Sequence, residues 1–314
     1  MKSNITKVVI IGAGAVGATT AYSLVVKGIA AEVVLVDINK EKAQGEVWDI
    51  QHSIDFQNRN VRIKVGDYKE CGDADIVVIT ASAPMDGETN RLMMLEKTAT
   101  IIRNIIPPVM ESGFDGIFVV VSNPVDVMAY LVKELSGLPK NRVIGTGTIL
   151  ETARLKQKIG EIMGMDPSSI DACVLGEHGD TMMIPWSHVR AGGKNFLEIL
   201  SDNRDMLQEV DIDSIVQQTK RAGYYVLKSK GNTQYGIAGA VTGIVAAILG
   251  NENKLYAVSA YLEGEYGIEG IYLGVPAILN RDGIKDIGVF NLNEEEKEQL
   301  IHSADIIRNS IERL

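Results

Sequence analysis

Three glycines near the amino terminus have the spacing of a loop that holds phosphate groups. Gly12, Gly14 and Gly17 stand in the order G-x-G-x-x-G, and the first of them lies near the end of the apolar run KVVIIGA (7–13). The first glycine allows a tight turn, the second lets the backbone approach a pyrophosphate, and the third lets the next helix pack on the sheet. The amino terminus of that helix offers free N–H groups and a positive dipole end to the phosphates. The pattern predicts a dinucleotide-binding loop, and the alternative is a strand-to-helix turn without a ligand.

An acidic residue follows this loop at the distance expected for a contact to ribose. Asp37 ends the apolar run AEVVLVD, 20 residues after Gly17. A carboxylate there accepts hydrogen bonds from the adenosine ribose and repels a 2′-phosphate, so we expect NAD rather than NADP. The alternative is that Asp37 only caps the end of a strand. Four further residues are expected to line the cofactor site: Ala15, Val16, Thr80 and Ala81.

A histidine in a loop could supply acid–base chemistry. His178 lies in VLGEHGDTMM (174–183) and is one of four histidines in the chain. An imidazole titrates near neutrality, so it can give and take back a proton during a reaction. Most lone loop histidines are solvated or structurally satisfied, so this interpretation requires partner residues from elsewhere in the sequence.

The first half of the chain has the elements that would position these residues. Short runs rich in Val and Ile alternate with helical patterns, and the runs show little internal alternation of polar and apolar residues. This arrangement is typical of a doubly wound parallel sheet buried on both faces. The strands are expected at 7–13, 31–37, 74–80, 116–124 and 142–147. The helices are expected from the glycine loop to Lys27 and at 41–50, 91–112 and 125–135.

The sequence pattern changes after about residue 148. Mixed strands are expected at 170–176 and 183–190, and apolar segments with turns at 254–290. Asn293 is a plausible cap for a final amphipathic helix. The other helices are expected at 150–163, 207–228 and 234–249. The predicted fold is α/β: a Rossmann-type dinucleotide-binding domain over residues 1–147, followed by an α+β substrate and catalytic domain over 148–314.

Composition and charge restrict the possible partners. Apolar residues make up 46% of the 314-residue chain, which permits a large buried core, and the formal net charge is −10. That charge argues against nucleic acid and anionic membranes as partners, because phosphates need Lys and Arg to displace their counterions. The uncharged run 8–26 carries the glycine loop and is explained by a folded strand and helix rather than by a membrane span. Cys71 and Cys173 lack metal-ligand spacing, and two lone thiols favour a reducing, cytoplasmic setting.

Three further stretches carry a family resemblance. VSNPVDV (121–127), GTGTILETARL (145–155) and LGEHGDT (175–181), together with the glycine loop, resemble the L-lactate/L-malate dehydrogenase family over essentially the whole chain. The resemblance implies an NAD-dependent oxidoreductase with a nucleotide-binding half followed by a substrate half. It also implies a small 2-keto or 2-hydroxy monocarboxylic acid as substrate and a homo-oligomer, either a tetramer or a dimer.

The resemblance implies roles for the polar residues of these stretches. His178 would be the acid and base that protonates the carbonyl oxygen, a role typically worth a factor of ~10²–10⁴ in rate. Arg154 would hold the substrate carboxylate with its planar fork; the alternative is a structural ion pair. Arg91 would polarise the carbonyl from a mobile loop; the alternative is a solvated charge.

Three other residues match positions around the reacting groups. Asn123 would orient the substrate near the nicotinamide, and otherwise it is a turn residue before Pro124. Thr233 matches a wall of the substrate pocket. Ile237, about one helical turn further on, would pack against the nicotinamide. For Thr233 and Ile237 the alternative is ordinary helix packing.

Two positions depart from the family pattern. Glu151 stands where the family usually has an aspartate paired with the histidine, and we expect this longer carboxylate still to pair with His178. The pairing should keep the pKa of His178 near or above neutrality. Where malate enzymes carry an arginine and lactate enzymes a glutamine, an ungapped count from Arg91 gives Met85, and alignment of GET gives Pro84. Neither is cationic, so a dicarboxylate would bury an unpaired charge at a cost of several kcal/mol.

The substrate expected from these positions is pyruvate or L-lactate. The alternative is an L-2-hydroxyisocaproate-type enzyme for longer or branched 2-keto acids, since a methionine makes an adaptable apolar contact. A non-catalytic NAD-binding module would need the glycine loop but not the histidine and arginines. An S-adenosylmethionine-dependent transferase on a similar sheet is disfavoured, because it gives no reason for the arginines.

Activation by fructose 1,6-bisphosphate is not expected. Family members that respond to it carry an arginine two residues after the substrate arginine and a histidine seven before the catalytic one. Lys156 and Asp171 occupy these positions here, and an aspartate would repel a phosphate. A large fall in the KM for pyruvate on addition of the sugar bisphosphate would refute this expectation.

Overall fold

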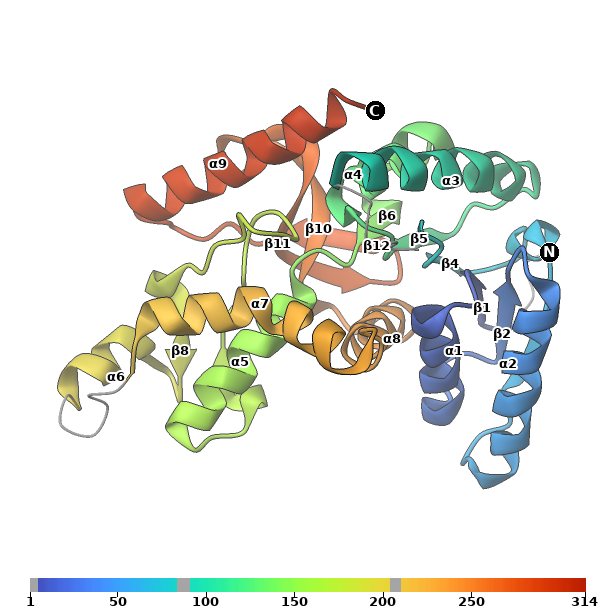
Figure 1. Ribbon diagram of the computed structural model, residues 1–314, viewed down its shortest axis with the longest axis horizontal. Coiled ribbons are helices and arrows are strands. Elements are labelled where there is room, and N and C mark those ends of the chain that lie inside the picture. Colours follow the sequence, from blue (N-terminus) through green and yellow to red (C-terminus); the bar gives the residue numbers. More distant parts are fainter. Residues whose placement is uncertain (1–4, 84–90, 204–209) are drawn as a thin grey trace.

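A nine-stranded sheet runs through the part of the chain that the structure describes (Figure 1). The computed structural model describes residues 5–83, 91–203 and 210–314, and the side chains of Arg91 and Leu92 lie outside the description. The strand order is β12-β11-β10-β6-β5-β4-β1-β2-β3, and the pairings from β3 to β6 are parallel. The parallel strands are β1 Lys7–Ile11, β2 Glu32–Val36, β3 Arg62–Val65, β4 Ile76–Ile79, β5 Ile117–Val120 and β6 Val143–Gly145.

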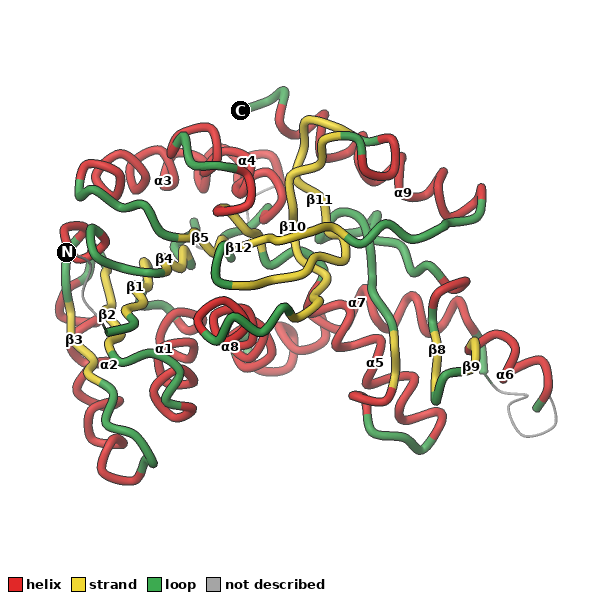
Figure 2. The backbone as a smooth tube through the Cα atoms, turned by 180° about the vertical axis from the view of Figure 1, so that it is seen from behind, coloured by secondary structure: helices red, strands yellow, loops and turns green. Residues whose placement is uncertain are grey.

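Helices cover both faces of this sheet. Successive side chains of a strand point to opposite faces, so Val8 and Ile10 enter one core while Val9 and Ile11 enter another. Figures 1 and 2 show α3, α4 and α9 on one side of the sheet and α1, α2 and α8 on the other. These helices are α1 Ala15–Lys27, α2 Lys40–Ser53, α3 Arg91–Glu111, α4 Val125–Ser136, α8 Tyr235–Leu249 and α9 Glu294–Ile311. The predicted doubly wound α/β fold is confirmed.

The sheet extends into the second half of the chain, which the sequence did not predict. The segments expected only as apolar runs with turns are the antiparallel strands β10 Lys254–Glu263, β11 Glu269–Asn280 and β12 Gly283–Ile287. β10 joins the parallel strands where Ser259 pairs with Gly145 of β6. At the opposite edge, β3 was also missed, because its residues RIKV alternate charged and apolar side chains.

A third hydrophobic core fills the rest of the second half, around the fully buried Phe196 and Leu155. It packs α5 and α7 with a small antiparallel sheet in the order β7-β8-β9, at one end of the molecule (Figure 2). The strands expected at 170–176 and 183–190 are therefore wrong in length, since two-residue strands and the isolated bridges Leu175–Met183 and Gly176–Gly274 form there instead. The elements are α5 Ile149–Met163, β7 Ile170–Asp171, β8 Arg190–Ala191, β9 Lys194–Asn195, α6 Phe196–Asp202 and α7 Ile212–Lys230.

Short turns and caps complete the described chain. Asn293 caps α9 as predicted, with a reciprocal capping box to Glu296. Short 3₁₀ turns are η1 Ile54–Phe56, η2 Tyr68–Cys71, η3 Lys140–Arg142, η4 Pro167–Ser169, η5 Trp186–His188 and η6 Glu265–Gly267. None of the described helices is both long and apolar enough to cross a bilayer.

Candidate active site

One buried carboxylate joins the predicted acid–base residue to the predicted substrate arginine. Glu151 Oε2 lies 3.0 Å from His178 Nδ1, and Glu151 Oε1 accepts a hydrogen bond from Arg154 Nη1 at 2.8 Å. The Glu151 side chain is 6% exposed, whereas those of Arg154 and His178 are 19% and 27% exposed. The expected contact between Glu151 and His178 is therefore present. Glu151 is also the ion-pair partner of Arg154, which the sequence did not identify, so one carboxylate contacts both groups.

The electrostatics of this cluster favour a charged imidazole. Burial alone lowers the pKa of His178, but the charge and hydrogen bond of Glu151 outweigh it, so the pKa is raised above its ordinary value. Burial raises the pKa of Glu151, but His178 and then Arg154 outweigh it, so that pKa is lowered. Each partner therefore favours the charged form of the other.

Backbone and hydroxyl contacts fix the helix of Glu151 and Arg154 against the segment that leads to His178. Thr148 Oγ1 donates to the carbonyl of Val174 at 2.5 Å, and the Val174 N–H donates to Thr152 Oγ1 at 2.9 Å. Gly176 then exchanges two backbone hydrogen bonds with Gly274 of β11, at 2.9 and 3.0 Å. Residues far apart in the sequence are thus held in one geometry by buried bonds.

A glycine makes room for the guanidinium of Arg154. A Cβ added to Gly223 of α7 would lie 3.2 Å from Arg154 Nη2. A guanidinium has five N–H donors, and Glu151 takes one of those on Nη1. The ion pair offered as the alternative role is present, yet it leaves donors for a second carboxylate.

A second buried carboxylate contacts the backbone of His178 and was missed from the sequence. Asp126, in the first turn of α4, is 2% exposed. Its Oδ2 accepts the His178 N–H at 2.9 Å, and its Oδ1 accepts the Ser259 hydroxyl at 2.6 Å. The stretch VSNPVDV carries the family resemblance, but an acid early in a helix is usually explained by the helix dipole, so nothing in the sequence distinguished Asp126.

The glycine loop has the shape that a pyrophosphate requires. Gly12 has φ +110°, and a Cβ on Gly17 would meet the Gly12 carbonyl oxygen at 1.9 Å, so both positions exclude side chains for conformational or packing reasons. A Cβ on Gly14 would meet nothing within 4 Å. The protein itself therefore does not require glycine there, whereas a ligand lying against the backbone would. The loop residues Ala15 and Val16 begin α1.

Asp37 and Thr80 support this loop from the ends of the neighbouring strands. Asp37 Oδ2 accepts the Ala13 N–H at 2.6 Å and Oδ1 accepts the Asn39 N–H at 2.8 Å. The capping role given as the alternative is thus present, and carboxylate oxygens have further lone pairs for ribose hydroxyls. Thr80 Oγ1 donates to the Gly12 carbonyl at 3.0 Å, and the Ala81 N–H donates to Ile11 O at 3.1 Å. These residues fit NAD, and Ile38, which is 98% exposed, offers an apolar surface beside them.

The other predicted site residues lie around the same edge or outside the description. Asn123 is exposed just beyond the end of β5 and precedes a cis peptide bond to Pro124. Thr233 lies in the connection between α7 and α8, not in a helix as its alternative role assumed, and Ile237 is in the first turn of α8. Met85 and Pro84 lie outside the described residues. Arg91 is the first residue of α3, and its side chain is not described.

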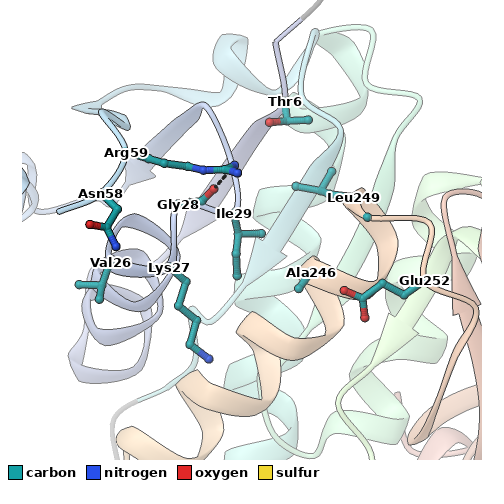
Figure 3. A pocket seen from close by; sticks show the side chains of 11 residues that line it. Thr6, Val26, Lys27, Gly28, Ile29, Asn58, Arg59, Ala246, Leu249 and Glu252 are labelled. Atoms are coloured by element: carbon teal, nitrogen blue, oxygen red, sulfur yellow. Dashed lines mark hydrogen bonds between the residues drawn. The ribbon is translucent and has the colours of Figure 1, made fainter.

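A cavity of ≈ 450 Å³ lies elsewhere, between the carboxyl-terminal ends of α1 and α8 (Figure 3). Its lining includes Lys27, Arg59 and Glu252, and Arg59 Nη1 donates to the Gly28 carbonyl at 3.3 Å. It shares no residue with the predicted site. Among the described residues, no group of three or more His, Cys, Asp or Glu side chains could hold a metal ion.

The comparisons with known proteins define the class. Residues 6–145 match the family described as lactate/malate dehydrogenase, NAD binding domain, and residues 148–314 match its alpha/beta C-terminal domain. The chain belongs to the lactate/malate dehydrogenase family, and the predicted family, NAD cofactor and class of oxidoreductase are confirmed.

Particular relatives share the whole length of the chain. It is 48% identical to L-lactate dehydrogenase 3 of Bacillus cereus (strain ATCC 10987 / NRS 248) over 98% of both chains, and 43% identical to L-lactate dehydrogenase 2 of Bacillus anthracis over 99% of both. It superposes on the ligands-bound minor L-lactate dehydrogenase from Enterococcus mundtii with a TM-score of 0.95, at 41% identity over 98% of both chains. The ligands-unbound form gives 0.90, at 41% identity over 99% of this chain and 98% of that one.

Proposed function

We propose that the protein is an NAD-dependent L-lactate dehydrogenase that interconverts pyruvate and L-lactate. The observation that carries the proposal is the junction of His178, Glu151 and Arg154 through one buried carboxylate. An acid–base group fixed beside an arginine that keeps free donors is what a 2-keto acid requires. The names of the relatives support the same substrate. A non-enzymatic NAD-binding module gives no reason for this junction.

The roles of the residues follow from their contacts. Arg154 binds the substrate carboxylate through N–H groups that Glu151 does not use, which fixes the orientation of the keto acid. Because Nδ1 of His178 faces Glu151, Nε2 is the atom that donates a proton to the carbonyl oxygen and takes it back in reverse. NADH, when bound, supplies the hydride. Arg91 is proposed to polarise the carbonyl, and Asn123 and Thr233 to position the substrate.

The cofactor is proposed to lie along the carboxyl ends of the parallel strands. Ligands of such sheets bind in the crevice at this edge. The glycine loop would hold the pyrophosphate, Asp37 the ribose and Ile237 the nicotinamide, with the substrate domain beginning at residue 148. Ala15, Val16, Thr80, Ala81 and Asn123 complete the proposed cofactor site.

The side chain of the substrate is tested by a comparison of keto acids. Because Met85 or Pro84 offers no cation, kcat/KM should be highest for pyruvate and lowest for oxaloacetate, with NADH as reductant. A preference for 2-ketoisocaproate would favour the L-2-hydroxyisocaproate alternative. A preference for oxaloacetate contradicts the proposal about the pocket, and the absence of NADH oxidation with every short keto acid contradicts the proposed function.

A homo-oligomer in the cytoplasm is proposed from surface and thiol properties. Tyr224 and Tyr225 of α7 and Trp48 of α2 are 59%, 50% and 58% exposed, and large exposed apolar side chains are typical of protein interfaces. Light scattering after gel filtration distinguishes a dimer or tetramer from a monomer.

The cysteines support the proposed cytoplasmic location. Cys71 and Cys173 are free and buried, and burial raises the pKa of each to about 12, which suits unreactive thiols in a reducing compartment.

A further inference from the structure

We propose that the cavity between the carboxyl-terminal ends of α1 and α8 binds a small zwitterion with an apolar body, of the class of the free apolar α-amino acids. None of the residues that line this cavity belongs to the proposed active site or cofactor site (Figure 3). The inference therefore does not depend on the proposed function, and it can be tested by binding alone.

The cavity has the size and part of the lining of a small-molecule site. Its volume is ≈ 450 Å³, and typical ligand pockets measure roughly 300–1,000 Å³. Four apolar side chains contribute to its wall: Val26, Ile29, Ala246 and Leu249. Contact with such a wall removes apolar surface from water, which favours a ligand that carries a hydrocarbon part.

Two side chains of opposite charge line different walls of the cavity. Arg59 lies in the connection between η1 and β3, and Glu252 follows the end of α8 on the other side (Figure 3). Within the described part of the chain, neither side chain forms an ion pair, with the other or with any third group. Opposite charges that share one cavity without meeting leave space for a ligand that carries both complementary charges.

The packing of Arg59 against the end of α1 holds its guanidinium beside the cavity. Gly28 has φ +60°, and a Cβ on it would lie 2.6 Å from Arg59 Cδ, so only a glycine lets the arginine lie across this helix end. Arg59 Nη1 donates to the Gly28 carbonyl at 3.3 Å. A guanidinium has five N–H donors, so four remain for a ligand carboxylate.

The other nearby cations have roles of their own. Lys27 lies in the last turn of α1, where a positive charge is favoured by the helix dipole. Lys254 lies outside the lining, and its ammonium is 5.3 Å from the centroid of the Tyr256 ring. The pKa of Lys254 is raised first by Tyr256 and least by Glu252. The carboxylate of Glu252 is therefore available to a ligand ammonium.

The backbone at the two helix ends is already hydrogen-bonded. The N–H groups of Gly28 and Ile29 donate to carbonyls of the last turn of α1, and those of Gly250, Asn251 and Glu252 donate to carbonyls of the last turn of α8. The charges of Arg59 and Glu252 are thus the groups that a ligand would satisfy. A dianion would be repelled by the carboxylate and a simple amine by the guanidinium, whereas a zwitterion suits both.

L-leucine is the probe, titrated by calorimetry into the full-length protein without cofactor or substrate. The charge variants are Arg59→Gln and Glu252→Gln, and Ala246→Trp fills the cavity without a change of charge. Asp55→Asn is the matched control, because Asp55 is an exposed carboxylate that does not line the cavity. Arg154→Gln tests whether the amino acid binds instead at the proposed carboxylate anchor of the active site. Thermal unfolding shows which variants are folded.

L-leucine should bind at one saturable site, and each charge variant should weaken it by about tenfold or more, since a hydrogen bond to a charged group is lost. Ala246→Trp should abolish binding, and it decides if the charge variants do not fold. Asp55→Asn and Arg154→Gln should bind as the wild type does. Two analogues test the pair of charges: 4-methylpentanoate lacks the ammonium and 3-methylbutylamine lacks the carboxylate, so both should bind more weakly than L-leucine.

Several results would overturn the proposal. These are the absence of saturable binding, unchanged affinity in the folded cavity variants, loss of binding in a folded Arg154→Gln protein, and an analogue that binds as tightly as L-leucine. A protein that binds L-leucine in the cavity but oxidises NADH with no keto acid would leave the proposed site standing and contradict the proposed function.

Discussion

Replacement of Glu151 by glutamine removes the charge that His178 and Arg154 share. The two contacts, at 3.0 and 2.8 Å, use both oxygens of the carboxylate. A glutamine has one oxygen and one NH₂ group, so it cannot accept from both partners. If its oxygen faces Arg154, its NH₂ donates to His178 Nδ1. That hydrogen bond selects a neutral imidazole, which is a poor acid.

The size of the effect follows from burial. Removal of one partner from a buried ion pair typically costs about 3–5 kcal/mol, and Glu151 is 6% exposed. The same loss in the transition state corresponds to a fall of roughly 10²–10⁴ in kcat/KM.

The pH dependence of stability follows from the two shifted pKa values. His178 has a raised pKa, so its contribution to stability is full below its ordinary value of 6.5 and is lost as pH rises through the raised value. The lowered pKa of Glu151 gives a contribution that is full above 4.5 and lost as pH falls through the lowered value.

The assay is NADH oxidation by pyruvate across pH 5–9, with chemical denaturation as the measure of stability. Glu161→Gln is the control, because Glu161 is an exposed carboxylate on the same helix, and it should leave both quantities unchanged. Glu151→Asp keeps the charge but shortens the reach, so it should lose less activity than Glu151→Gln. The loss of stability in Glu151→Gln should be largest between pH 4.5 and 6.5. A Glu151→Gln enzyme with kcat/KM within threefold of wild type and the same pH profile would refute the reasoning.

Two further predictions concern backbone packing and stability. Gly14→Ala should weaken NADH binding at least tenfold, as measured by fluorescence titration. It should keep the melting temperature of the wild type, because the new Cβ would meet no protein atom within 4 Å. Gly17→Ala should lower both the affinity for NADH and the melting temperature, because its Cβ would lie 1.9 Å from the Gly12 carbonyl oxygen. Equal loss of stability in the two variants would contradict the proposed ligand contact. Tyr266→Phe should lower the free energy of unfolding in denaturant by about 1–3 kcal/mol. The Tyr266 hydroxyl donates to the Gly288 carbonyl at 2.9 Å and accepts the Phe290 N–H at 3.0 Å, and both hydrogen bonds would be lost. An unchanged unfolding midpoint would contradict this prediction.

The parallel half of the fold was predictable because its signals are local. A strand buried on both faces is a continuous apolar run, and glycines mark the turn after β1. The antiparallel strands β10, β11 and β12 carry apolar runs too, but their place beside β6 depends on the single pairing of Ser259 with Gly145. Such a pairing between distant segments leaves no periodic trace in the sequence. The small sheet was misjudged because its strands are only two residues long.

Residues of the candidate site were predictable where their types match a family pattern. Contacts that depend on the length of a side chain or on the packing of distant segments were not predictable. The resemblance supplied His178, Arg154 and Glu151, but the sequence could not say that one carboxylate contacts both of the others. Asp126 and Ser259 are 133 positions apart, and their hydrogen bond forms only when β10 joins the sheet. Neither residue type is unusual in its own segment, so nothing in the sequence connects them.

The charges around the imidazole explain why a monocarboxylate suits this site. Glu151 and Asp126 favour the protonated form of the imidazole, and Arg154 opposes it. A bound monocarboxylate adds one negative charge, which favours the proton on His178 that reduction requires and is offset if Arg91 closes over it. A second carboxylate without a cationic partner is expected to cost several kcal/mol if it is buried. We therefore expect oxaloacetate to be the poorest of the three keto acids, because neither Met85 nor Pro84 is cationic.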